Sequence, residues 1–302
     1  MMNKISRWFS QGGLGPGIFW VVVGCFFSNC GDLAVKLVSY LPAMQIAFMR
    51  VMLGTLLLVP WVIQQHRGVL RIKQPFWQVA RVIVGFLAVW LWSYGAARTS
   101  LLATTTISFT CPILVLPLAY FCLGERSDFS RVLAVLVAFI GVLVVAVAEP
   151  GGVEEYVGFL HGGTLVLVVS ATLFALSDIL NKKLVAQEGV YSLLFYFCLG
   201  STLLAAVPCY LVWRPIGWYE FLILTMLAGS GILLLFAILK AVEACDLAAL
   251  APYKYLEVLF SVFWGYVLFN EYLRWSIVVG CGLIVASALW VSYVSSFNGN
   301  ST

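Results

Sequence analysis

Two stretches of the sequence decide the fold: FFSNCGDLAVKLV at residues 26–38 and TLFALSDILNKKL at residues 172–184. Each lies within an apolar run and carries an aspartate followed four positions later by a lysine. These are Asp32 with Lys36, and Asp178 with Lys182. The chain contains only four aspartates, so this match at an offset of 146 residues indicates an internal duplication.

Other uncommon residues match at the same offset without any gap. The pairs are Gly17 with Gly163, Gly54 with Gly200, Gly85 with Gly231, Tyr120 with Tyr266, Glu125 with Glu271 and Ser130 with Ser276. Each copy contains five apolar runs. Because five is odd, the second copy must enter the membrane from the opposite side, which is the inverted repeat of many secondary transporters.

Composition places this duplication in a membrane. Hydrophobic residues make up 63% of the 302 positions and charged residues 10%, and the mean hydropathy is +1.03. A soluble domain of this size needs more polar surface. Ten runs are long enough to cross a bilayer: 17–38, 41–63, 76–97, 100–123, 129–148, 160–181, 190–213, 218–240, 247–269 and 275–295.

The predicted fold is therefore all-α and integral to the membrane, with ten transmembrane helices in two inverted five-helix repeats. The segments are an N-terminus at 1–16, a first repeat at 17–148, an external linker at 149–159, a second repeat at 160–295 and a C-terminus at 296–302. Ten lysines and arginines fall on the side of the N-terminus and four on the other side. This bias predicts that both termini are cytoplasmic, in a bacterial inner membrane.

Several classes of function lack their signatures. The eight cysteines lie almost entirely in apolar runs without a CxxC spacing, and the basic residues form no stripe that would suit nucleic acid. His66 and His161 belong to no HExxH pattern, and no GxSxG is present. We therefore expect no enzyme, no metal and no cofactor, and the sequence leaves the oligomeric state open.

Ionisable residues inside a span are costly and usually meet a partner or a solute. Lys254 and Glu257 share one face of the ninth span with Ser261, so they either bind a zwitterionic solute or form a buried structural pair. Arg50, halfway along the second span, aligns with Tyr196 in the other repeat, so its charge is one-sided. This asymmetry favours a role with a ligand or a partner over simple scaffolding.

The aspartate–lysine pairs occupy late turns of the first helix in each repeat, one near each face of the membrane. Asp32, Lys36, Asp178 and Lys182 are thus gate candidates. The alternative is an ordinary i,i+4 ion pair at each helix end. Arg81 lies near the end of the third span, where its head is expected to extend toward water or phosphates.

Three motifs carry a resemblance to a known family: AFMR at 47–50, SFTCPILVLPLAYFCLGE at 108–125 and APYKYLEVLFSVFWGYVLFNE at 251–271. The chain resembles the EamA-type drug/metabolite transporter superfamily. That resemblance implies a central cavity lined mainly by spans three, four, eight and nine, with help from spans one and six. The substrate-binding candidates are then Arg50, Tyr94, Ser108, Tyr196, Tyr253, Lys254, Tyr255 and Glu257.

Taken together, these features predict a secondary transporter that moves a small organic metabolite by alternating access. Charged groups with aromatic neighbours suit a polar or zwitterionic solute with a flat ring, and the resemblance extends to carriers of S-adenosylmethionine or riboflavin. Export of amino acids or other metabolites, a channel and an intramembrane enzyme are the alternatives. Coupling to protons or to exchange of solutes is left open.

Overall fold

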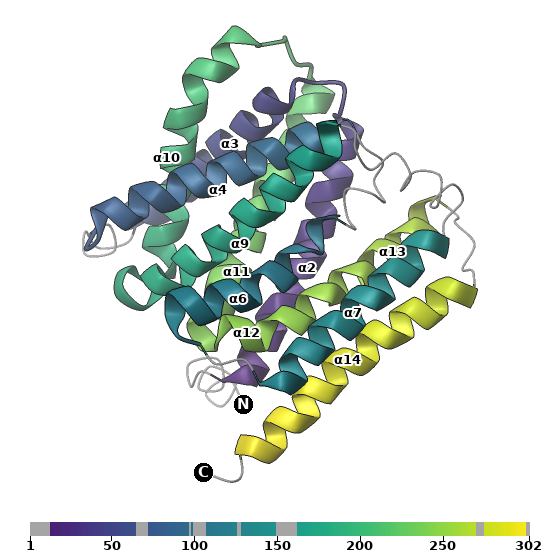
Figure 1. The fold of residues 1–302 in the computed structure, drawn as a ribbon. Coiled ribbons are helices and arrows are strands. Elements are labelled where there is room, and N and C mark those ends of the chain that lie inside the picture. The colour runs from purple at the N-terminus through teal and green to yellow at the C-terminus, as the bar shows by residue number, and fades with distance from the viewer. Residues whose placement is uncertain are drawn as a thin grey trace.

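The computed structural model describes residues 13–64, 72–96, 98, 107–125, 128–148, 162–269 and 275–299, and every regular element in these ranges is a helix (Figure 1). The first repeat contains α2 (Leu14–Leu37), α3 (Ala43–Gln64), α4 (Pro75–Ala96), α6 (Cys111–Leu123) and α7 (Phe129–Ala148). The second contains α9 (Gly162–Glu188), α10 (Val190–Leu211), α11 (Trp218–Ala244), α12 (Leu247–Leu250), the 3-10 helix η2 (Ala251–Leu256), α13 (Glu257–Phe269) and α14 (Trp275–Gly299).

The helices have the length and apolarity that a bilayer demands. Six of them are long and apolar enough to span it (α2, α3, α4, α9, α10 and α11), and α6, α7 and α14 contain shorter apolar segments. Large apolar side chains point outward, among them Phe121 at 80% exposed and Leu203 at 68%. Lipid is the solvent that makes such a surface stable, so the protein is a multi-pass membrane protein.

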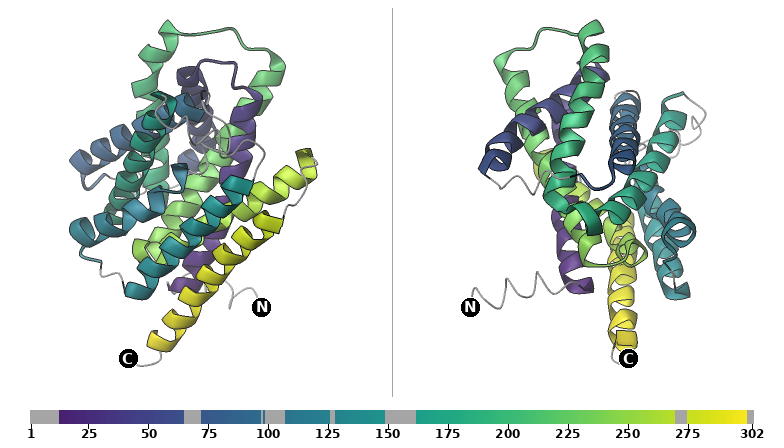
Figure 2. Two further views of the ribbon diagram at one scale, coloured as in Figure 1. Left: turned by 45° about the vertical axis from the view of Figure 1, so that its right-hand side comes forward. Right: turned by 90° about the vertical axis from the view of Figure 1, so that its left-hand side faces the viewer.

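Helix packing follows the duplication. α2 packs on α11, and the equivalent pair from the other repeat, α9 on α4, packs as well. Two further contacts occur in both repeats. The packing of α3 on α11 is equivalent to that of α10 on α4, and the packing of α2 on α13 is equivalent to that of α9 on α6. Each first helix therefore lies against helices of the opposite repeat. Figures 1 and 2 show the start of α2 and the end of α14 at the same end of the bundle.

Two residues locate the pseudo-two-fold axis that relates the repeats. Phe109 and Tyr255 are separated by 146 positions, so they are equivalent. Their rings stack with centroids 5.7 Å apart, and the Tyr255 hydroxyl donates to the Phe109 carbonyl at 3.1 Å. A residue can touch its own equivalent only near the axis, so the axis passes between these rings.

The ninth span is not the single helix expected over 247–269. It consists of α12, then η2, then α13, which begins at Glu257. Pro252 lacks a backbone N–H and disfavours continuous α-helix, which accounts for a change of helix type here. The equivalent helix α6 begins at Cys111, the position that corresponds to Glu257. Both repeats therefore start a helix at the same point, next to the axis.

Helices α7 and α14 lie side by side at the edge of the molecule (Figure 1) because two glycines allow their backbones to meet. A Cβ added to Gly280 would lie 2.6 Å from the Gly141 carbonyl oxygen, and one added to Gly141 would lie 2.8 Å from the Gly280 carbonyl oxygen. Neither position can hold a side chain without separating the helices.

Candidate substrate site

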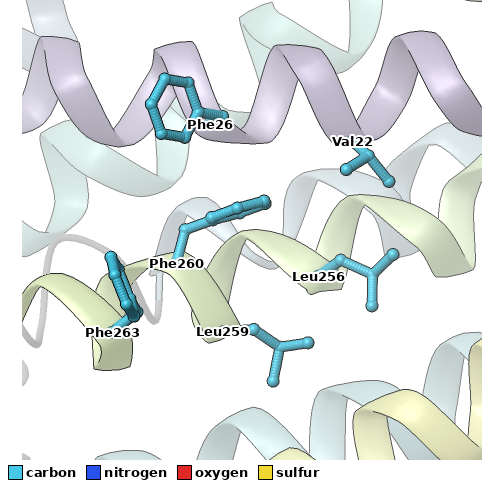
Figure 3. A pocket seen from close by; sticks show the side chains of 6 residues that line it. All are labelled: Val22, Phe26, Leu256, Leu259, Phe260 and Phe263. Atoms are coloured by element: carbon cyan, nitrogen blue, oxygen red, sulfur yellow. The ribbon is translucent and has the colours of Figure 1, made fainter.

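A cavity of about 390 Å³ lies between α2 and the segment formed by η2 and α13 (Figure 3). It is lined by Val22, Phe26, Leu256, Leu259, Phe260 and Phe263. Three of the six are phenylalanines, from two helices. A cavity of this size with an apolar, aromatic lining is within the range of small-molecule sites.

Polar groups adjoin the cavity through the residues next to its lining. Asn29, on α2, donates to the carbonyl oxygens of Cys25 and Glu257, each at 3.1 Å. Ser261 donates to the Asn29 side-chain oxygen at 2.7 Å. The Cys25 thiol in turn donates to the Lys254 carbonyl at 3.7 Å. The interrupted helix thus leaves carbonyl groups that side chains of α2 and α13 can reach.

Charged side chains from five elements gather beside this network. Lys254 of η2 forms an ion pair with Asp178 of α9, and both side chains are largely buried. The Glu257 carboxylate accepts a hydrogen bond from the Ser28 side chain. Asp32 of α2 lies within electrostatic range of both Glu257 and Arg50. A glycine permits this arrangement, because a Cβ on Gly231 would lie 2.7 Å from Arg50 Nε.

We call these five residues the central charge cluster: Asp32, Arg50, Asp178, Lys254 and Glu257. It holds three carboxylates and two cations, so its formal charge is −1 when all are ionised. Interior charges are retained in membrane proteins where they meet partners or solutes. The cluster adjoins the cavity along the chain, because Leu256 of the lining directly precedes Glu257.

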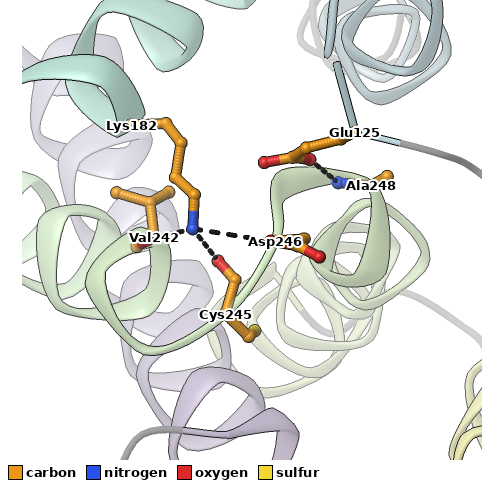
Figure 4. Close-up of polar contacts among 6 residues, drawn as sticks. All are labelled: Glu125, Lys182, Val242, Cys245, Asp246 and Ala248. Carbon is orange, nitrogen blue, oxygen red and sulfur yellow. Dashed lines mark hydrogen bonds and ion pairs between the residues drawn. The ribbon is translucent and has the colours of Figure 1, made fainter. Parts of the chain in front are cut away.

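The structure changes the expected pairings. Lys254 forms its ion pair with Asp178, whereas the sequence had left open a structural pair with Glu257. The i,i+4 pair of Asp178 with Lys182, which the sequence left as the alternative to a gate, is not formed. Lys182 donates instead to the carbonyls of Val242 at 2.8 Å and Cys245 at 2.7 Å, and its Nζ lies 3.8 Å from Asp246 Oδ1 (Figure 4).

Lys182 therefore belongs to a clasp at the end of the bundle where α9 and α11 finish. An ammonium group is favourable there because the last carbonyls of a helix lack partners. Figure 4 shows a second link beside it, in which the backbone N–H of Ala248 donates to Glu125 Oε2 at 3.2 Å. Together the two contacts join α9 and the end of α6 to the junction of α11 and α12.

The remaining candidates lie elsewhere or contact other groups. Tyr255 is fully buried on the axis, and Tyr253, 2% exposed, packs in the hydrophobic core. The Tyr94 ring lies 3.6 Å from the Arg98 guanidinium carbon, and the Tyr196 ring packs edge-on against Phe195. Ser108 is helical and lies three residues before the start of α6, and Lys36 is exposed in the last turn of α2.

Arg81 does not extend toward water as expected. It is 1% exposed, and its Nη1 donates to the Leu193 carbonyl at 2.9 Å while its Nε donates to Asn181. Its guanidinium carbon also lies 5.3 Å from the centre of the Phe197 ring. The side chain is therefore held inside the protein by α9 and α10.

Comparison with known proteins explains the duplication. The family model described as the EamA-like transporter family matches twice, at residues 15–147 and 161–293. The chain belongs to the EamA-like transporter family. The two matches begin 146 positions apart, which is the offset of the repeat. Membership in this family confirms the predicted fold and makes the protein a transporter.

Two bacterial relatives are similar to this chain over most of their length. The S-adenosylmethionine uptake transporter of Rickettsia prowazekii is 31% identical over 278 residues, which is 92% of each chain. The pseudopaline exporter CntI of Pseudomonas aeruginosa is 24% identical and covers 92% of this chain and 96% of its own. One crystal structure, 19% identical, covers 91% of this chain and 96% of its own with a TM-score of 0.74, which supports the same fold.

Sequence reasoning missed Ser28, Asn29 and the aromatic cavity. Ser28 and Asn29 could have been noticed, because they are polar residues within an apolar run, one turn before Asp32. The phenylalanines could not, because aromatic residues make up 15% of the chain and nothing local distinguishes those that face the cavity.

Among the described residues, no group of three or more His, Cys, Asp and Glu side chains is arranged to hold a metal ion. His66, His161 and Glu271 lie outside the described ranges.

Proposed function

We propose that this protein is a secondary carrier of S-adenosylmethionine that works by alternating access. The observation that carries the proposal is the central charge cluster, of formal charge −1, beside an aromatic cavity. S-adenosylmethionine has two positive groups, a sulfonium and an ammonium, one carboxylate and a flat adenine ring. Its net positive charge complements the cluster, and its ring suits Phe26, Phe260 or Phe263.

The relatives support the same substrate, since those that match at 30–31% identity are named S-adenosylmethionine uptake transporters. Export of an amino acid or another metabolite is the second candidate, supported by the more distant relative named a pseudopaline exporter. Both candidates use the same charged and apolar surfaces. The transported solute therefore has to be measured.

Uptake and counterflow in proteoliposomes test the proposal. Radiolabelled S-adenosylmethionine should show saturable counterflow, and unlabelled S-adenosylmethionine should compete better than S-adenosylhomocysteine, which lacks the sulfonium charge. Riboflavin and amino acids complete the competitor set. Counterflow of an amino acid but not of S-adenosylmethionine would favour the second candidate. Equal competition by S-adenosylmethionine and S-adenosylhomocysteine would contradict the role of the cluster.

Variants of the cluster connect the transport to the site. Glu257→Gln removes one carboxylate with little change of shape, and we expect it to lower the affinity for S-adenosylmethionine. Lys240→Gln is the matched control, because Lys240 pairs with Glu243 on an exposed part of α11. A pH gradient imposed on the same vesicles separates proton coupling from solute exchange. If the gradient changes the rate of transport by the wild type but not by Glu257→Gln, the Glu257 carboxylate carries the proton.

We further propose that both termini are cytoplasmic in a bacterial plasma membrane. The lysine and arginine bias supports this orientation. The Lys182 clasp then closes the cytoplasmic side, and Lys36, its equivalent, serves the external side in the opposite state. Labelling of single cysteines at Ser127 and Ser301 from inside and at Gly152 from outside is expected, and labelling of Gly152 from the cytoplasm alone would invert the topology.

A further inference from the structure

A second group of polar side chains lies apart from the central charge cluster, where the start of α4 packs against the end of α9 and the start of α10. Gln78 and Arg81 are three residues apart and share a face of α4, and Gln74 precedes that helix. They face Asn181 and Glu188 of α9 and the first turn of α10. The interior is otherwise mostly hydrocarbon, so these buried groups need partners.

The partners found among the described residues are too few. Arg81 uses Nε and Nη1, while its Nη2 has none, and neither atom of the Gln78 amide is bonded. The Ser192 hydroxyl is also unbonded. Glu188 accepts from the Gln74 backbone through Oε1 at 2.8 Å but not through Oε2. Gln78, Arg81 and Ser192 are 3%, 1% and 1% exposed.

In the other repeat, the positions equivalent to the buried polar groups of this interface are apolar. At an offset of 146, Gln78 corresponds to Leu224, Arg81 to Leu227, Asn181 to Val35 and Ser192 to Ile46. All four apolar equivalents are buried and pack in one hydrophobic cluster. Leucines therefore serve at the positions equivalent to Gln78 and Arg81, and polarity at these two positions is not a requirement of the fold.

We propose that the interface of α4 with α9 and α10 is an internal water-binding site, in which bound water bridges Arg81, Gln78, Ser192 and Glu188. The unbonded donors are Arg81 Nη2 and Gln78 Nε2, and the unbonded acceptors are Gln78 Oε1 and Glu188 Oε2. The Ser192 hydroxyl can both donate and accept. An anion would satisfy only the donors and would meet the Glu188 carboxylate; a cation would meet the Arg81 guanidinium. Water satisfies both kinds, and a buried water typically makes two to four hydrogen bonds to such groups.

Hydration makes the two equivalent interfaces mechanically different. Groups bridged by water can exchange partners as helices shift, whereas separation of Leu224 and Leu227 from Val35 exposes apolar surface. The start of α10 is therefore expected to be the wetter of the two helix starts, and the start of α3 the drier.

X-ray hydroxyl-radical footprinting of the full chain in lipid nanodiscs tests the site. Radicals form from water at the place where it is bound, so a buried side chain is oxidised only if water lies beside it. Leu193 and Leu227 are both 0% exposed and have the same intrinsic reactivity. We expect Leu193 to be oxidised severalfold faster than Leu227. Equal, background rates at the two leucines would overturn the proposal.

Substitution gives a second readout. Gln78→Leu copies the residue of the dry interface, and Leu224→Met is the control on that interface. A hydrated site predicts that Gln78→Leu reduces the oxidation of Leu193 and lowers the melting temperature, because water bridging to Arg81 is lost. A rise in the melting temperature would mean that the Gln78 amide is simply unpaired, and would contradict the proposal even if Leu193 were accessible.

Discussion

Replacing Asp178 by Asn should destabilise the protein because it leaves the Lys254 ammonium without its carboxylate. The Lys254 and Asp178 side chains are 22% and 9% exposed. Removing one partner of a buried ion pair typically costs about 3–5 kcal/mol. On the scale of roughly 2–4 °C per kcal/mol for large domains, the melting temperature should fall by at least about 6 °C.

Thermal unfolding of the purified protein in one detergent gives the measurement. The control is Lys240→Gln, which breaks an exposed pair whose side chains are 29% and 43% exposed. Such a pair contributes about 0–1 kcal/mol, so this variant should unfold close to the wild type.

A double variant separates the pair from its surroundings. Asp178→Asn combined with Lys254→Gln removes both charges, and it should be more stable than Asp178→Asn alone because no unpaired ammonium is left. The reasoning is refuted if Asp178→Asn unfolds at the temperature of the Lys240→Gln control, or if the two substitutions are simply additive.

Two further predictions concern other contacts. Gly280→Val should destabilise the packing of α7 on α14 by about 1–3 kcal/mol. The control Gly282→Ala should be nearly neutral, because nothing lies within 4 Å of its added Cβ. Similar melting temperatures for the two variants would contradict the close approach of the helices. Burial raises the pKa of Glu125, so the folded state holds the Glu125 proton more tightly than the unfolded state does. The stability of the wild type should therefore fall as the pH rises from about 4.5 through the pKa of Glu125 in the folded state. Glu125→Gln should lack this slope in melting temperature against pH, and an identical slope would exclude Glu125 as its source.

Much of the architecture was predictable because lipid imposes strict rules. Spans need about 20 apolar residues, so their number and order can be read from the sequence. The repeat was detectable because Asp32 and Asp178 are rare in such a composition, and an odd number of spans makes it inverted. Arg50, Lys254 and Glu257 stood out for the same reason, as charges within apolar runs.

The partners of those charges were not predictable. Spacing suggested local pairs, Asp178 with Lys182 and Lys254 with Glu257, but the structure joins Asp178 to Lys254 across 76 positions. The burial of Arg81 and the Phe26 and Phe260 lining likewise depend on helices from distant parts of the chain.

The sequence by itself thus determined a duplicated, ten-span transporter fold and which residues carry charge within the membrane. Only the tertiary structure decided which charges meet, where the cavity lies and where the ninth span is broken into separate helices. The reason is physical: hydrophobicity and periodicity act along one helix, whereas a buried side chain pairs with the nearest group that packing brings to it. In an inverted repeat, that group often comes from the opposite repeat or from a helix far along the chain.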